Sequence, residues 1–89
     1  MLILDYSSQF KKDFKKITKM PIPDIIDVGN VISTLKKGLT LEAKYVDHPL
    51  SGNWNGFRDC HIKPDLVLIY CINENTLQLA RIGSHADLF

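Results

Sequence analysis

All three histidines of this chain lie in its C-terminal half, at His48, His61 and His85, among turn-forming and charged residues. The same stretch holds Asp65 and Arg81. Histidine is the side chain that gains and loses a proton near neutral pH without help from its surroundings. A set of histidines with a carboxylate and a guanidinium therefore points to acid–base chemistry, provided that folding brings these side chains together.

Cleavage of a phosphodiester bond in RNA without a metal ion suits this set. The 2′-hydroxyl must lose a proton, the leaving 5′-oxygen must gain one, and the phosphate carries extra negative charge in the transition state. The planar fork of Arg81 can bind that phosphate, and Phe89 or Trp54 can stack on an unpaired base. The candidates for proton transfer are His48, His61, Asp65 and His85.

Each of these residues also has a purely structural interpretation. A lone histidine is usually a hydrogen-bonded structural residue, and Asp65 can simply begin a turn. Arg81 can pair with Asp59 across a sheet, and residues near a chain terminus tend to fray. A zinc site assembled from the three histidines is disfavoured, because none has a neighbour at ligand spacing. We therefore predict neither a metal nor another cofactor.

The composition bounds the class of protein. Eighty-nine residues with 45% apolar and 24% charged side chains fit one soluble domain spanning residues 1–89. No apolar run is long enough to span a membrane, and the N-terminus does not resemble a signal peptide, so we expect a cytoplasmic protein. The net charge of +1 gives no general signal for nucleic acid. Five lysines nevertheless gather within nine residues, opposed only by Asp13: Lys11, Lys12, Lys15, Lys16 and Lys19.

The hydrophobic pattern predicts an α+β fold with the order β-α-α-β-β-β. Residues 2–6 are expected to form a strand, and Ser7 or Ser8 to cap a helix with Phe10, Phe14 and Ile17 on its apolar side. A second helix should end near Gly38, and a long loop over 39–53 follows it. Strands are predicted at 54–62, 66–72 and 76–82, followed by a tail. We expect an antiparallel sheet covered on one face by the helical hairpin.

Strand alternation places Asp59 and His61 on one face of the sheet, and Arg58 and Cys60 on the other. The helices can cover only one of these faces. A bulge would exchange the two sets, so the sequence leaves open whether Arg58 or His61 lies on the uncovered side.

Residues 47–70 and 81–89 resemble the YafQ-type toxins of the RelE/ParE superfamily. The shared motifs are D-H-P-L-x-G-x-W-x-G-F-R-D-x-H, P-D-x-x-L-I-Y and R-x-G-S-H, and the N-terminal half is similar mainly in layout. On the family pattern, the catalytic set is matched by His48, His61, Asp65 and His85. Phe89 matches an aromatic position tied to activity, and Arg81 a basic position suited to phosphate. At Leu66 some relatives carry an aromatic residue.

The resemblance implies a RelE-like, microbial-ribonuclease-like fold and the toxin of a type II toxin–antitoxin pair. Such toxins are metal-independent endoribonucleases that cut messenger RNA in the ribosomal A site. A ribbon–helix–helix antitoxin neutralises them and brings them to operator DNA. The lysines of residues 11–19 would then face ribosomal RNA. Two alternatives stay open: a ParE-like toxin that binds DNA gyrase and cuts nothing, and an inactive co-repressor.

Overall fold

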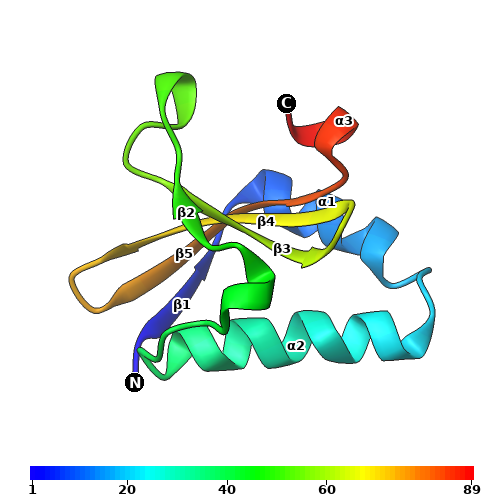
Figure 1. The fold of residues 1–89 in the computed structure, drawn as a ribbon, viewed down its shortest axis with the longest axis horizontal. Coiled ribbons are helices and arrows are strands. Elements are labelled where there is room, and N and C mark those ends of the chain that lie inside the picture. Colours follow the sequence, from blue (N-terminus) through cyan, green and yellow to red (C-terminus); the bar gives the residue numbers. More distant parts are fainter.

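The computed structural model describes residues 1–89 and has an α+β fold, in which a five-stranded sheet carries two long helices on one face (Figure 1). The order of strands and helices predicted from the sequence is confirmed. The elements are β1 (Ile3–Tyr6), α1 (Ser8–Ile17), α2 (Ile22–Lys36), the 3-10 turn η1 (Ala43–Tyr45), β2 (His48–Pro49), the 3-10 turn η2 (Gly52–Trp54), β3 (Arg58–Lys63), β4 (Leu66–Asn73), β5 (Thr76–Gly83) and α3 (His85–Leu88).

The sheet has the strand order β1-β5-β4-β3-β2. Strands β3, β4 and β5 form the antiparallel meander that the short connections predict. Strand β1 joins the edge beside β5 in parallel, so the sheet is mixed and not purely antiparallel. At the opposite edge, the two-residue strand β2 pairs with β3. Neither long helix is sufficiently long and apolar to cross a membrane.

Helix α1 begins at the serine cap expected from the sequence. The Ser7 hydroxyl accepts a hydrogen bond from the Phe10 N–H at 2.8 Å and donates one to the Ala80 carbonyl at 2.6 Å. The cap therefore also ties the start of the helix to strand β5. Phe10 and Ile17 are buried against the sheet, as the helical period requires.

Helix α2 carries its proline in the first turn and ends before Gly38, which adopts a positive φ of 76°. Its buried side is formed by Val28, Val31 and Leu35. The spacing of Ile25, Val28, Ile32 and Leu35 in the sequence predicts an apolar stripe that omits Val31, which is fully buried.

In the C-terminal half, the structure corrects the start of one predicted strand and shows regular elements in two segments predicted as a loop and a tail. The predicted strand over 54–62 begins only at Arg58, because η2 and a turn at Gly56, with φ of 91°, occupy the preceding residues. The side chain of Trp54 packs edge-on against Phe57, with ring centroids 5.3 Å apart. The predicted loop over 39–53 contains η1, β2 and the start of η2, and the predicted tail forms helix α3.

The two faces of the sheet carry different sets of residues. The helix-covered face includes Cys60, Leu68 and Tyr70 in the main core. The opposite face has a smaller apolar cluster of Val67 and Ile69, covered by Leu88 of α3 and by the segment that carries Trp54. Since Cys60 faces the helices, its neighbours Asp59 and His61 face the other side. His61, and not Arg58, therefore lies on the face of the sheet away from the helices.

Candidate functional site

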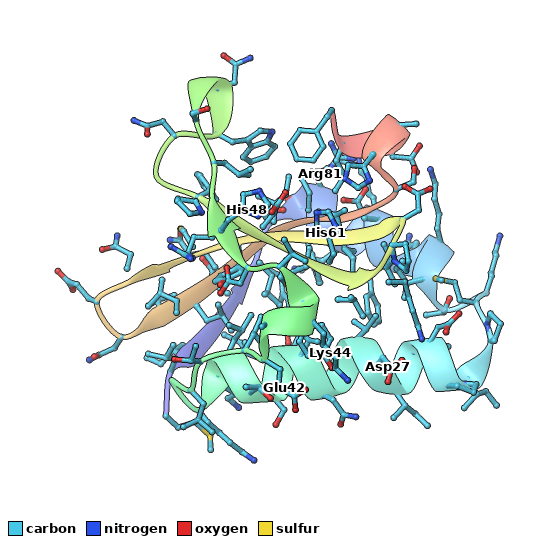
Figure 2. All side chains as sticks on the ribbon, viewed as in Figure 1. Asp27, Glu42, Lys44, His48, His61 and Arg81 are labelled. Atoms are coloured by element: carbon cyan, nitrogen blue, oxygen red, sulfur yellow. The ribbon has the colours of Figure 1, made fainter.

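His48 and His61 lie on the face of the sheet away from α2 (Figure 2), and the ring of His85 lies next to that of His61. We call His48, His61 and His85 the histidine row. The ring centroids of His48 and His61 are 6.2 Å apart, and those of His61 and His85 are 5.0 Å apart. The ring of Phe89 lies 6.1 Å from that of His85. Folding thus gathers side chains that span forty-two positions of the sequence into one site.

Sheet register explains this convergence. His48 in β2 pairs with Asp59 in β3, and His61 lies two residues further along β3, on the same face. The pairings of His61 with Val67 and of Val67 with Gly83 bring the end of β5 beside His61. The Ser84 hydroxyl accepts a hydrogen bond from the Asp87 N–H at 3.2 Å, and this cap turns the chain into α3 at His85. A well-formed terminus therefore replaces the expected frayed tail.

Both ring nitrogens of His48 face acceptors. Its Nδ1 lies 2.8 Å from the Val46 carbonyl oxygen, which can only accept a hydrogen bond. Its Nε2 lies 3.0 Å from Oδ1 of Asp59, whose side chain is buried. That oxygen has no other hydrogen-bond partner, so a proton on Nε2 would satisfy it. These two contacts fix the position and orientation of the His48 ring.

His85 is held by a different carboxylate. Oδ1 of Asp65 accepts the His85 backbone N–H at 3.1 Å and lies 3.2 Å from Nδ1 of the ring. These bonds, first the backbone one and then that of the ring, lower the pKa of Asp65 below its usual value. Asp65 consequently stays ionised at neutral pH and favours a proton on Nδ1. The Nε2 atom of His85 is left without a hydrogen bond and is free to exchange a proton with a substrate.

Arg81 lies opposite Ile69 in the sheet, and its guanidinium binds Asp13, which was not predicted as a site residue. Its Nε donates to Oδ2 of Asp13 at 2.8 Å, and its Nη2 to Oδ1 at 3.1 Å. The unpaired residue Ala80 interrupts the register of β5 just before Arg81, and such bulges change the direction of a side chain. The alternative in which Arg81 pairs with Asp59 across the sheet does not occur, because Arg81 binds Asp13 and Asp59 contacts His48. Three of the five guanidinium N–H groups remain available for a phosphate.

The buried carboxylate of Asp13 anchors α1 to β5. It also accepts hydrogen bonds from Gln9 at 3.1 Å and from the Ile82 backbone N–H at 3.2 Å. Burial alone would raise the pKa of Asp13, but the bonds from Arg81, Gln9 and Ile82 outweigh it and lower the pKa. The one sequence signal for this role was that Asp13 is the single acidic residue among the lysines of α1.

The four lysines of α1 and Lys19 in the turn after it are all exposed, and we call Lys11, Lys12, Lys15, Lys16 and Lys19 the lysine face. A hollow of about 210 Å³ is lined by Lys16 of α1, by Asp65 and by Asp87 of α3. One end of the lysine face therefore borders the carboxylate that holds His85. No group of three or more His, Cys, Asp or Glu side chains is arranged to hold a metal ion.

The model of the family described as "Bacterial toxin of type II toxin-antitoxin system, YafQ" matches residues 2–89. The chain belongs to the YafQ toxin family. Among its relatives, the mRNA interferase toxin YafQ of Escherichia coli K12 is 40% identical over 87 residues, which are 97% of this chain and 94% of that protein. The putative toxin YafQ of Haemophilus influenzae is 42% identical over 94 residues, covering 97% and 90% of the two chains.

Solved structures of bacterial toxins share the fold. YafQ in the E. coli DinJ–YafQ complex superposes with a TM-score of 0.88 at 39% identity, over 100% of this chain and 99% of the other. A metal-bound toxin from Helicobacter pylori superposes with a TM-score of 0.84 at 42% identity, over the whole of both chains. The RelE-like α+β fold and the YafQ resemblance predicted from the sequence are thereby confirmed. This YafQ-family chain is a toxin of the type II toxin–antitoxin class.

Proposed function

We propose that this YafQ-family toxin is an endoribonuclease that cuts messenger RNA in the A site of the ribosome by metal-independent acid–base catalysis. The observation that carries the proposal is the histidine row with one end, His85, held by Asp65 at 3.2 Å. The name of the E. coli relative, an mRNA interferase, supports the substrate class. In-line cleavage requires two proton transfers and a cation. The chain supplies imidazoles whose neighbouring ring centroids are 5.0 and 6.2 Å apart, together with the guanidinium of Arg81.

His85 and Asp65 form the proton-transfer pair in this proposal. Asp65 fixes Nδ1 of the ring, so that Nε2 exchanges a proton with the ribose or the leaving oxygen. His48 and His61 position the phosphate and share its charge. The remaining N–H groups of Arg81 bind a non-bridging oxygen. Phe89 is 59% exposed beside His85, where it can stack on a base of the messenger.

The lysine face docks on ribosomal RNA in this proposal. Each exposed lysine can neutralise one phosphate, and such contacts weaken as salt rises. Because the hollow between Lys16 and Asp65 joins the lysine face to the site, a chain of phosphates on α1 would lead toward the histidines. Cleavage on the ribosome also implies that the protein works in the cytoplasm.

The partner that neutralises the toxin is a ribbon–helix–helix antitoxin, through which the pair binds operator DNA. YafQ of E. coli is found in complex with DinJ, which supports an antitoxin partner for this chain. The antitoxin also provides a control for folding, because a correctly folded toxin variant should still bind it.

The proposal is tested by replacing the proton-transfer pair. His85→Ala and Asp65→Asn should each relieve the growth arrest caused by expression of the toxin, and both should still co-purify with the antitoxin. Primer extension on cellular messenger RNA should show cleavage for the wild type and none for the variants. Toxicity retained by both variants would contradict the assignment. Growth arrest without any cleaved messenger would instead indicate a ParE-like inhibitor of gyrase.

Metal independence needs its own measurement, since a toxin from H. pylori has been crystallised with a metal ion. Cleavage on ribosomes should persist when phenanthroline removes transition metals but leaves the Mg²⁺ that ribosomes require. Loss of cleavage, restored by added zinc or copper, would show that the histidines act through a metal.

A further inference from the structure

We propose that Asp47 is a positioning residue for His48, held by Tyr70 and Arg58 so that the backbone before His48 keeps a strained conformation. This inference rests on the proposed function, because it gives His48 a part in the reaction. Asp47 does not face the histidine row and is not among the residues expected to act on RNA. Its role would be to fix where the imidazole stands.

The strain lies at Val46, the residue before Asp47. Val46 has φ of 51° and ψ of 47°, the left-handed region that a β-branched residue rarely adopts. Its side chain is 53% exposed, so apolar packing does not compensate for this conformation. Such a residue persists only when the surrounding structure fixes it. The conformation has a visible consequence, since it turns the Val46 carbonyl toward Nδ1 of His48 at 2.8 Å.

The contacts that fix this backbone converge on Asp47. The Tyr70 hydroxyl donates a hydrogen bond to Oδ2 of Asp47 at 2.7 Å, and Nε of Arg58 donates to Oδ1 at 3.0 Å. Tyr70 is buried in the central strand β4, and Arg58 begins β3. The segment before β2 is therefore attached to the two strands that form the middle of the sheet. Burial and the neighbouring Asp47 raise the pKa of Tyr70, so its hydroxyl keeps the donated proton.

We call Asp47, Tyr70 and Arg58 the clamp. The register of the sheet places the clamp and the histidine row on opposite faces. Pro49, Arg58 and Tyr70 are paired across β2, β3 and β4. The adjacent set of paired residues, His48, Asp59 and Ile69, points to the opposite face. Asp47 and His48 are consecutive, so a clamp on one face sets the position of the ring on the other. The ring is then held at three points: by the backbone, by the Val46 carbonyl and by Asp59.

Two variants remove the clamp with little change in shape. Tyr70→Phe deletes the donor hydroxyl, and Asp47→Asn removes the charge that holds Arg58. Tyr45→Phe is the control, because Tyr45 is a half-buried tyrosine beside this segment whose hydroxyl makes no hydrogen bond within the protein, unlike that of Tyr70. Each clamp variant should slow single-turnover cleavage on the ribosome by roughly tenfold to a hundredfold, the usual effect of a misplaced catalytic group, without weakening binding. The control should cleave at the wild-type rate.

The decisive readout is epistasis with His48→Ala. If Asp47 acts through His48, Asp47→Asn should slow the wild type but leave the rate of the His48→Ala variant unchanged. Independent, multiplicative losses would overturn the proposal.

Nitrogen-15 spectra of the imidazoles test the same idea without any activity. His48 Nδ1 should report a fixed hydrogen-bonded proton in the wild type and in Tyr45→Phe, and an averaged signal in both clamp variants. An unchanged His48 signal in the clamp variants would overturn the proposal. If the wild type failed to cut messenger RNA while these spectra behaved as expected, the proposed function would fail and the clamp would stand.

Discussion

Replacing Arg81 with alanine should destabilise the fold strongly, whatever its effect on RNA. The carboxylate of Asp13 accepts four hydrogen bonds, and Arg81 donates two of them. Removing one partner of a buried ion pair costs about 3–5 kcal/mol. Because the Arg81 side chain is 23% exposed and Gln9 and Ile82 remain as donors, water and these donors should reduce the loss to about 2–3 kcal/mol. That is a large part of the ~5–15 kcal/mol that stabilises an ordinary domain.

The assay is equilibrium unfolding in urea at neutral pH, with Arg81→Ala compared with the double variant Arg81→Ala/Asp13→Asn. The double variant removes the buried charge as well as its partner, so it should unfold at a higher urea concentration than Arg81→Ala alone. The free energies of unfolding of the two variants should fall with urea concentration at the same slope, which would show that both expose the same surface on unfolding. The reasoning is refuted if Arg81→Ala lies within about 0.5 kcal/mol of the wild type, the range of ordinary surface changes.

The difference in free energy of unfolding between the wild type and Arg81→Ala should change with pH in a definite direction. In the wild type the pKa of Asp13 is lowered, so its stabilising effect is present above the unfolded-state value and is lost as pH falls through the lower folded value. In Arg81→Ala, burial is opposed by fewer donors, and the pKa should rise relative to the wild type. The gap between wild type and variant should therefore be small in acid and grow as pH rises through about 4, the usual range for aspartate.

Three further predictions follow from the same structure. Replacing Lys11, Lys15 and Lys16 with glutamate should weaken association with ribosomes at physiological salt at least tenfold, as measured by sedimentation, whereas unchanged association would remove the lysine face from docking. Phe89→Ala should reduce cleavage by weakening base stacking, worth about 1–3 kcal/mol, and Phe89→Trp should restore most of it in the same assay. Ser7→Ala should lower the free energy of unfolding by about 1 kcal/mol through loss of the helix cap and of the bond to Ala80; an unchanged urea midpoint would show that the cap is dispensable.

Local patterns in the sequence predicted most of the fold. The spacing of Phe10, Phe14 and Ile17 identified α1, and the apolar run of β4 identified the central strand, because both signals arise from neighbouring residues. The strand predicted over 54–62 exists as β3, but its predicted start at Trp54 was wrong, because an aromatic residue favours a strand although Gly52 and Gly56 turn the backbone there. The parallel pairing of β1 depends on contacts with the far end of the chain, which local pattern does not encode.

For the candidate site as well, the sequence predicted the residues with a local chemical signal and missed those whose role depends on distant contacts. Residue chemistry selected the histidines and Asp65, and the family motifs placed them in one set. The carboxylates that contact His48 and Arg81 were not predicted: Asp59 was considered only as a partner of Arg81, and Asp13 was given no role in the site. Each acts through a partner that is distant in the sequence or across a strand pair, as with Asp13 and Arg81. Such pairings become visible only in three dimensions.

The most direct test of the proposed function is cleavage of a defined messenger RNA by the purified toxin, with and without ribosomes that hold a known codon in the A site. The proposal predicts a cut within that codon only when ribosomes are present, and its loss in His85→Ala. Equal cleavage of free messenger, or a cut that survives replacement of His85, would contradict it.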